Sequence, residues 1–323
     1  MSTVDTVFDR TFDWVDQIEN SNRLKVLTIV LALVVFSALP FLLGGYNQRV
    51  ATYILLGIIL ASAYNIIGGL AGYPSFGHAV FIGMGAYSTG ILMNRYGVPF
   101  EVTILTGGVI AAVFALLTGP PMLRLRGHYF AIATLGLQLA VMRAVNSIPF
   151  LGGGTGWPAI VSYGQIAFYF MFLGLAVLTI GLVWLIRRSR FGYGLRALSL
   201  NQEHAEMVGV PTTAYKTAAY VVSAIPVGMA GVLFAGWLNF VQIATVFEVE
   251  LSINMILYVL LGGVGTLVGP IIGAITLEMI NQYLWAQYPN LHVLFYGVLI
   301  IGIVLFLPGG LAEVWENLRD RYS

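Results

Sequence analysis

The chain has 323 residues, of which 59% are hydrophobic and 9% are charged, and its formal net charge at pH 7 is +1. Soluble domains carry about a quarter charged residues, so this composition excludes an ordinary soluble domain and indicates a membrane protein. The absence of cysteine excludes disulfides and thiolate metal sites, and the small net charge gives no indication of nucleic-acid binding.

Residues 1–22 form the first predicted element, an amphipathic cytoplasmic helix. Its apolar residues recur at helical spacing: Val4, Phe8, Phe12, Val15 and Ile18. Aspartates occupy another face, which argues against binding to anionic lipid because membrane-surface helices are usually rich in Lys and Arg. We expect the helix to lie along the bundle or to contact a partner, with a solvated leader as the alternative. The next apolar window has no small-residue cleavage site, so we expect an anchor rather than a removed signal peptide.

Apolar windows of about 20 residues, the length that crosses the hydrocarbon core, recur along the rest of the chain. The predicted crossings are 24–43, 50–68, 76–94, 102–122, 128–148, 166–186, 217–238, 250–263, 266–285 and 292–308. The predicted fold class is therefore all-α: a polytopic membrane helix bundle of about ten transmembrane helices with glycine-broken segments and both termini in the cytoplasm. The transmembrane domain is expected to span 23–311, with a polar cytoplasmic segment at 187–216 and a cytoplasmic tail at 312–323.

The distribution of basic residues supports this topology. With the N-terminus inside, most of the 15 Lys and Arg residues fall on the cytoplasmic side: Arg10, Arg23, Lys25, Arg124, Arg126, Arg187, Arg188, Arg190, Arg196, Lys216, Arg319 and Arg321. Arg49 and Arg95 fall outside, and Arg143 lies within a span. Such an excess is the positive-inside pattern of membrane proteins.

Glycine interrupts two apolar segments, "NIIGGLAGYPSFGHAVFIGMGAY" (65–87) and "VLLGGVGTLVGPIIGAI" (259–275). Glycine permits close helix packing and also permits a helix to break at membrane depth, where protein or a wet cavity must cover the freed backbone. Paired interruptions of this kind often mark the substrate route of transporters. Either reading, packing or route, applies to these glycines: Gly68, Gly72, Gly262, Gly265, Gly269 and Gly273.

Several motifs in order resemble one family, the integral-membrane permeases of branched-chain amino acid ABC importers. The stretches that carry the resemblance are "GLAGYPSFGHAVFIGMGAY" (69–87), "LRLRGHYFAIATL" (123–135), "SRFGYGLRALSLNQEHAEMVGV" (189–210), "GGVGTLVGPIIGA" (262–274) and "LFLPGGL" (305–311). The resemblance is to the subunit type that pairs with a second, related permease, and it implies a multi-pass protein of the plasma (inner) membrane of a prokaryote.

The resemblance implies a role for the polar segment 187–216. In ABC importers a short cytoplasmic helix of the permease sits in a groove of the ATPase, in a loop with an "EAA…G" pattern. The matching residues here are Arg196, Glu203, Ala205, Glu206 and Gly209. An ordinary cytosolic loop is the alternative. The segment departs from the family pattern at His204, where a second alanine is common, which puts the matching of partners in doubt.

The chain contains no G-x-x-x-x-G-K-[ST] phosphate-binding loop, so we expect that it is not an enzyme and binds no cofactor of its own. The importer reading then requires two separate ABC ATPase subunits that use ATP-Mg, together with an extracytoplasmic substrate-binding protein.

Ionisable residues are few within the predicted spans: His78, Arg143 and Glu278. Such residues are functional candidates by default, but their scarcity favours ATP over ion coupling as the source of energy. Arg143 either reaches the outer interface or pairs with Glu278 or a substrate carboxylate. Ser75 and His78 suggest a hydrolase only weakly, because no G-x-S-x-G elbow is present. We expect His78 to donate a hydrogen bond that holds the glycine-rich break.

The substrate route would need polar groups within apolar walls. The candidates for this route are Ser75, Gly77 and His78 in the first glycine-broken segment, Tyr129, Thr134 and Gln138 in the fifth span, and Gly153 and Thr155 in the outer loop. Interhelical hydrogen bonding is an equal alternative for Tyr129, Thr134 and Gln138. For the function as a whole, a urea or short-amide permease of the same family and a stand-alone secondary carrier remain as alternatives.

Overall fold

The computed structural model describes residues 22–152, 154–287, 294, 297–298 and 301–302. The predicted N-terminal helix, except its last residue, and the predicted tail at 312–323 lie outside these residues. Most of the last predicted crossing, 292–308, lies outside them as well.

The described part of the chain is almost entirely helical. Its elements in order are α2 (Asn22–Leu42), α3 (Gly45–Tyr64), the π-helical turn η1 (Asn65–Leu70), α4 (Val80–Tyr96), α5 (Phe100–Met122), α6 (His128–Ser147), the 3₁₀ turn η2 (Pro149–Leu151), β1 (Trp157–Pro158), α7 (Gln165–Arg188), α8 (Arg190–Leu200), α9 (Gln202–Met207), α10 (Thr212–Leu238), β2 (Phe240–Val241), α11 (Ile243–Val246), α12 (Val249–Gly262) and α13 (Gly269–Gln287).

Six helices in the described ranges are long and apolar enough to cross a membrane. They are Gly45–Leu70, Phe100–Met122, His128–Ser147, Gln165–Arg188, Thr212–Leu238 and Ile243–Gly262. The chain is therefore an all-α, multi-pass membrane protein. The predicted crossing at 76–94 coincides with α4, which has only 17 residues because the backbone before Val80 is not α-helical. The first and ninth predicted crossings coincide with α2 and α13, and the count of ten stays a prediction.

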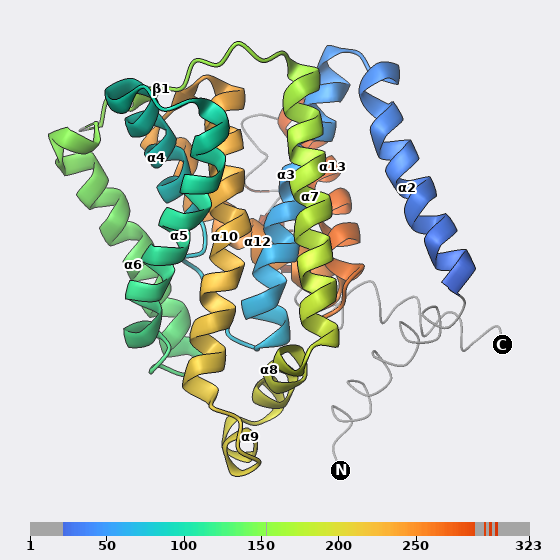
Figure 1. The fold of residues 1–323 in the computed structure, drawn as a ribbon, viewed down its shortest axis with the longest axis vertical. Helices are drawn as coiled ribbons and strands as arrows, with labels where there is room; N and C mark the ends of the chain where they lie inside the picture. The colour runs from blue at the N-terminus through green and yellow to red at the C-terminus, as the bar shows by residue number, and fades with distance from the viewer. Residues whose placement is uncertain (1–21, 153, 288–293, 295–296, 299–300, 303–323) are drawn as a thin grey trace.

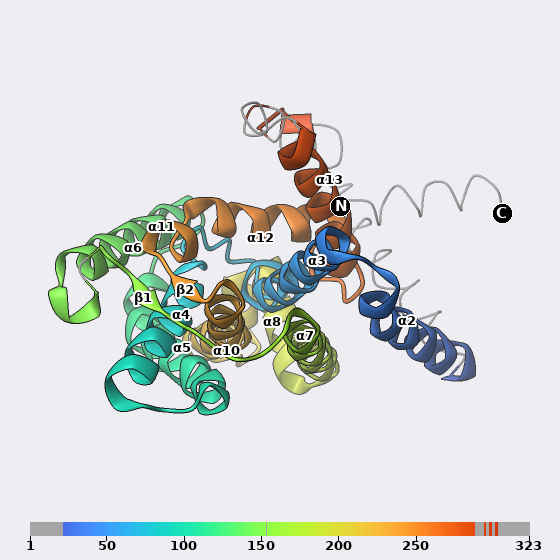
Figure 2. The same ribbon diagram turned by 90° about the horizontal axis from the view of Figure 1, so that it is seen from above.

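Two helices occupy the centre of the bundle. The most apolar window of Gly45–Leu70 is 83% buried and that of α10 is 67% buried, whereas that of α6 is only 22% buried. Figure 2 shows α10 and α7 nearly end on, with α12 running across the bundle behind them. The bundle therefore encloses α3 and α10 and leaves α6 at the edge.

Small residues bring α10 against α4 and α5. A Cβ on Gly85 of α4 would lie 1.9 Å from the carbonyl oxygen of Gly228, and one on Gly231 would lie 2.2 Å from that of Ile82. A Cβ on Gly228 would in turn lie 2.7 Å from the carbonyl oxygen of Gly107 on α5. Backbone contact of this kind is how helices associate where burial of apolar surface gives no driving force.

The two ends of the bundle differ in character (Figure 1). One end carries α8 and α9 and is called the α9 end. The other carries the short antiparallel pair of β1 and β2, in which Trp157 pairs with Val241, and is called the β1 end. There the indole of Trp157 donates to the Leu151 carbonyl at 2.8 Å, and the Arg95 guanidinium lies 4.2 Å from the centre of the Phe150 ring. The described residues of the loop at 150–159 thus form a folded cap.

Candidate functional site

A non-helical stretch of backbone separates η1 from α4. Residues 71–79, called the break, are not α-helical, and three side chains from other segments satisfy their amides. The Ser75 amide donates to the Tyr64 hydroxyl at 3.1 Å, and the Phe76 amide donates to Thr134 Oγ1 at 3.1 Å. The Ala79 amide donates to Ser252 Oγ at 2.8 Å. These bonds explain how non-helical backbone persists at membrane depth.

The partners of the break belong to a longer hydrogen-bonded chain. Ser252 Oγ donates to Gln138 Oε1 at 2.8 Å, and Gln138 Nε2 donates to the Phe247 carbonyl at 3.0 Å. Gly77 lies so close to α6 that a Cβ there would meet the Thr134 carbonyl oxygen at 2.0 Å. Thr134 and Gln138 therefore tie α6 and α12 to the break.

His78 does not make the expected hydrogen bond to the break. Its imidazole is fully buried and packs edge-on against the rings of Tyr64, Phe81 and Tyr220, at 4.9 to 5.9 Å between centroids. Neither ring nitrogen has a hydrogen-bond partner of ordinary geometry, and the backbone of Ser223 on α10 lies near the imidazole. The break is held by hydroxyl groups instead, so this prediction is wrong.

The second glycine-broken segment lies against the first. Asn65 Nδ2 donates to the Thr266 carbonyl at 2.7 Å, and Asn65 Oδ1 accepts from the Gly265 amide at 2.9 Å. Between α12 and α13, a Cβ on Gly262 would lie 1.7 Å from the Gly269 carbonyl oxygen. A Cβ on Gly273 would lie 1.9 Å from that of Tyr258. The packing reading of these glycines thus has a counterpart, because α12 and α13 pack through glycine. The route reading stays a prediction.

The structure brings together only some of the residues predicted for the substrate route. Ser75, His78, Thr134 and Gln138 converge with Gly77 at the break, and all four side chains are fully buried. Tyr129 stands apart, with 74% of its surface exposed. Thr155 is exposed at the β1 end, and Gly153 lies outside the described residues. The buried cluster is closed, so a solute would reach it only after the break moves.

The polar segment forms two short helices with well-defined ends. Ser189 Oγ caps α8 by accepting from the Gly192 amide at 3.2 Å. Asn201 Oδ1 caps α9 by accepting from the amides of Glu203 and His204 at 2.9 and 3.1 Å. At the other end of α9, Gly209 has a φ of +85°, and the Val210 amide donates back to the Ala205 carbonyl at 3.0 Å. This is a Schellman motif, which favours glycine at Gly209.

The residues predicted to contact an ATPase lie on or beside α9. Ala205 is buried against the bundle, while Glu203 and Glu206 are exposed. Glu203 lies 3.5 Å from Arg126 of the α5–α6 loop. Glu206 Oε1 accepts from Gln202 Nε2 at 2.8 Å and from Thr212 Oγ1 at 2.7 Å. These two hydrogen bonds hold the pKa of Glu206 below its usual value. Arg196 lies on α8, with its guanidinium 5.8 Å from the centre of the Tyr193 ring.

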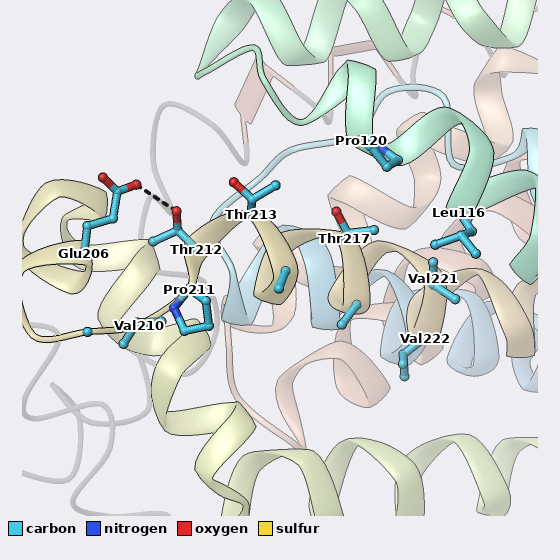
Figure 3. A pocket seen from close by; sticks show the side chains of 13 residues that line it. Leu116, Pro120, Glu206, Val210, Pro211, Thr212, Thr213, Thr217, Val221 and Val222 are labelled. Atoms are coloured by element: carbon cyan, nitrogen blue, oxygen red, sulfur yellow. Dashed lines mark hydrogen bonds between the residues drawn. The ribbon is translucent and has the colours of Figure 1, made fainter.

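A groove of about 1050 Å³ runs beside α9 (Figure 3). Leu116 and Pro120 of α5 line one side, and small or β-branched residues of α10 line the other. Glu206, joined to Thr212, stands at its α9 end. The groove is open and mostly apolar, and nothing in the sequence pattern had indicated it.

The sequence did not indicate that the side chain of Lys216 is buried and hydrogen-bonded. The residue was counted among the basic residues of the cytoplasmic side, yet its side chain is only 3% exposed. Its ammonium donates to the Leu123 carbonyl at 3.0 Å, to the Tyr73 hydroxyl at 3.2 Å and to Gln202 Oε1 at 3.4 Å. The available signal was the position of this lysine one turn into an otherwise apolar helix.

The arginines of the described residues lie mainly at the two ends of the bundle. Arg124, Arg126, Arg187 and Arg188 lie with α8 and α9, while Arg49 and Arg95 lie at the β1 end. Glu278 is buried in α13 and accepts from Tyr258 at 2.7 Å and from Gln282 at 2.8 Å. Arg143 is exposed, so the alternative in which it pairs with Glu278 does not hold in this structure.

Comparison with known proteins gives one family. Residues 47–304 match the family described as branched-chain amino acid transport system / permease component. The high-affinity branched-chain amino acid transport system permease proteins LivM of Salmonella typhimurium and Escherichia coli are each 27% identical to the chain over 326 residues, covering 91% of it and 76% of the relative. The autoinducer 2 import system permease protein LsrC of Yersinia pseudotuberculosis is 25% identical over 308 residues, covering 91% and 78%. No solved structure matches the chain.

Proposed function

Because the chain belongs to the family of branched-chain amino acid transport system permease components, we propose that it is the membrane-spanning subunit of an ATP-driven importer for branched-chain or other neutral amino acids. ATP-Mg is bound and hydrolysed by two separate ABC ATPase subunits. A second, related permease and an extracytoplasmic binding protein complete the assembly in the inner membrane of a prokaryote.

The observation that carries the proposal is the construction of α8 and α9. A soluble motor can act on a membrane bundle only through a rigid element that projects from it. Both helices are capped by side chains, α9 ends in a Schellman motif, and both project from one end of the bundle (Figure 1). The exposed surface of α9 presents two carboxylates, Glu203 and Glu206, beside the apolar side chain of Met207, which is a mixed surface suited to a soluble partner.

The position of the basic residues supports placing α9 in the cytoplasm. Arg124, Arg126, Arg187 and Arg188 gather at the α9 end, and cytoplasmic loops of membrane proteins carry an excess of Lys and Arg. The exposed, largely apolar face of α6, which includes Tyr129, Ile132 and Leu139, offers a surface that a second permease would cover.

The route for the solute is proposed to pass the break. Ser75, Gly77 and His78 lie in it, and Thr134 and Gln138 hold it, so opening the break would expose polar groups within apolar walls. Thr155 would stand at the outer mouth, and the role predicted for Gly153, which lies outside the described residues, stays a prediction. Because Ser75, His78, Thr134 and Gln138 are fully buried here, this role requires a second arrangement of residues 71–79.

The substrate itself rests on the relatives. The names of two of them specify branched-chain amino acids and that of a third specifies autoinducer 2, and a urea or short-amide substrate is a further alternative. Uptake of labelled leucine in the presence of unlabelled isoleucine, alanine or urea distinguishes a neutral amino acid substrate from a urea or short-amide substrate. Competition by the neutral amino acids and not by urea supports the proposal.

The test of coupling is ATP-driven uptake by the complete complex in proteoliposomes. Glu206→Ala removes the carboxylate that anchors Gln202 and Thr212, and Gly209→Trp forces a bulky residue into a φ of +85°. We expect each to reduce uptake by about tenfold, within the usual range of coupling between sites. Tyr96→Phe, on an exposed tyrosine at the end of α4, is the control and should leave uptake unchanged. Full uptake by both α9 variants, with the ATPase subunits still bound, would remove the coupling assignment.

A further inference from the structure

Lys216 is a buried ammonium held by oxygens that carry no formal charge. It stands in the second turn of α10, and its three donors meet the Leu123 carbonyl, the Tyr73 hydroxyl and Gln202 Oε1. An ammonium has three donors and no acceptor, so these partners satisfy it completely. The ring of Tyr73 adds a cation–π contact, with Nζ 5.0 Å from the ring centre.

Each partner of Lys216 belongs to a different segment. Leu123 directly follows α5 as its C-cap, Gln202 is the first residue of α9, and Tyr73 lies in the break. The Tyr73 hydroxyl also donates to Gln202 Oε1 at 2.7 Å, so the three side chains close a triangle. Gln202 in turn donates to Glu206 on the exposed surface of α9 at 2.8 Å. A continuous path of hydrogen bonds thus runs from that surface to the break.

A second contact runs beside this path. Gly72 has a φ of +73°, and a Cβ placed on it would lie 3.0 Å from the Cβ of Ser199 near the end of α8. The break therefore touches the polar helices through backbone packing at Gly72 and through hydrogen bonds at Tyr73. The other side of the break holds Ser75, Gly77 and His78.

Leaving a buried charge without partners is strongly unfavourable. A displacement of α9 that carried Gln202 away from Lys216 would incur this cost unless Tyr73 moved with it or water replaced both oxygens. The low-energy movement keeps Lys216, Tyr73 and Gln202 together. The break then follows α9.

We propose that Lys216 is a positioning residue that makes the break move together with α9, so that a displacement of α9 by an ATPase opens or closes the solute route. This inference rests on the proposed function. It assigns the transmission step to one triangle of side chains: Lys216, Tyr73 and Gln202.

Two variants test the proposal in the complete, reconstituted complex. Lys216→Met keeps the length and apolar stem of the side chain and removes every donor. Tyr73→Phe keeps the ring and removes only the hydroxyl that Lys216 and Gln202 share. Thr213→Val is the matched control on the first turn of α10, because Thr213 lines the groove (Figure 3) and takes part in none of the hydrogen bonds of Lys216, Tyr73 and Gln202. The measured quantity is the amount of solute taken up per ATP hydrolysed.

We expect Lys216→Met to lower uptake per ATP by about tenfold while hydrolysis continues, which is a coupling loss of ordinary size between sites. Tyr73→Phe should lower the same ratio less, and the effects of the two variants should not add in the double variant, because both break the same triangle. Thr213→Val should retain the ratio of the unchanged protein.

A direct readout separates transmission from stability. The chain has no native cysteine, so Ser75→Cys introduces a single thiol into the break. In the unchanged background, ATP should alter the rate at which a small thiol reagent modifies this cysteine. In the Lys216→Met or Tyr73→Phe background, that response should be lost.

The outcomes are distinct. If the unchanged complex gives no ATP-driven uptake, the proposed function itself fails. If uptake occurs, and Lys216→Met and Tyr73→Phe keep both the ratio of uptake to hydrolysis and the response of the Ser75→Cys thiol, Lys216 does not transmit movement. Should Lys216→Met fail to assemble, Tyr73→Phe alone decides, since it removes a single oxygen atom.

Discussion

At the scale of single residues, the conformation of the break depends on how closely the backbone of α6 approaches it. Thr134 serves the break twice, because its hydroxyl accepts from the Phe76 amide at 3.1 Å and its carbonyl lies where a Cβ on Gly77 would be. The geometry therefore leaves room for glycine alone at Gly77. Three backbone amides of the break are held from outside it, because they donate to the hydroxyl groups of Tyr64, Thr134 and Ser252.

Gly77→Ala tests this closeness. The new methyl group would lie 2.0 Å from the Thr134 carbonyl oxygen, so α6 or the break must shift. Overpacking of this kind costs about 1–3 kcal/mol, so we expect a lower thermal unfolding midpoint in detergent. Gly136→Ala, on the same helix α6 with open space around its Cβ, is the control and should not lower the midpoint. Equal midpoints for both variants would show that Gly77 does not lie against α6.

The sequence indicated much of this residue pattern but not its partners. Glycine spacing and a few polar letters within apolar windows marked Ser75, Gly77, Thr134 and Gln138, and the structure brings these four to one place. The spacing alone did not indicate that hydroxyl groups rather than His78 hold the break, because the accepting hydroxyl groups come from segments up to 173 residues away in sequence. Burial of Lys216 was equally hidden, since its acceptors lie in three other segments.

At the scale of elements, the ends of α9 decide how firmly it projects. The helix has only six residues, too few to be stable alone in water, so its caps and its contacts with the bundle must hold it. Asn201 satisfies its first amides, and the turn at Gly209 satisfies its last carbonyls. A helix that is to transmit force from an ATPase must be held rigidly at both ends, and α9 is held in this way.

Gly209→Ala and Gly97→Ala form a matched pair that tests this element. Each glycine lies just after the end of a helix and has a positive φ, which is +85° at Gly209 and +62° at Gly97. Both have open space where a Cβ would lie. Each substitution should cost about 1–2 kcal/mol of left-handed strain. Only Gly209→Ala should lower uptake per ATP, because Gly97 lies after α4 at the opposite end of the bundle. Amide hydrogen exchange of residues 202–210 should accelerate in Gly209→Ala alone. Similar uptake per ATP in the two variants would contradict the proposal that α9 couples the bundle to the ATPase subunits.

Helix boundaries followed from the sequence where apolar windows were long and uninterrupted. The predicted crossings at 102–122, 128–148 and 166–186 differ by only one or two residues from α5, α6 and α7. The prediction placed the start of a crossing at residue 76, whereas α4 begins at Val80, because Thr134 and Ser252 draw the amides of Phe76 and Ala79 out of a helical ladder. Such tertiary competition leaves no local signal.

At the scale of the whole molecule, the bundle has a closed centre and two unlike ends. The polar residues at the break are fully buried, and the carboxylate of Glu278 is occupied by Tyr258 and Gln282. Basic side chains gather at the α9 end, and a folded cap of β1 and β2 closes part of the other. The charge distribution predicted the basic end, and the β1–β2 cap was not predicted. The account that unites these features is a bundle whose break is moved from the α9 end by a partner that hydrolyses ATP.

The most direct measurement of this account is the accessibility of α9 to a membrane-impermeant thiol reagent in intact cells. The chain has no native cysteine, so Met207→Cys, at a side chain that is 74% exposed, and Thr155→Cys, at the β1 end, each present one thiol. We expect Thr155→Cys to be labelled from outside, and Met207→Cys to be labelled only after permeabilisation and to be protected when the ATPase subunits are bound. Labelling of Met207→Cys from outside, or labelling from inside that bound ATPase subunits leave unchanged, would contradict the account.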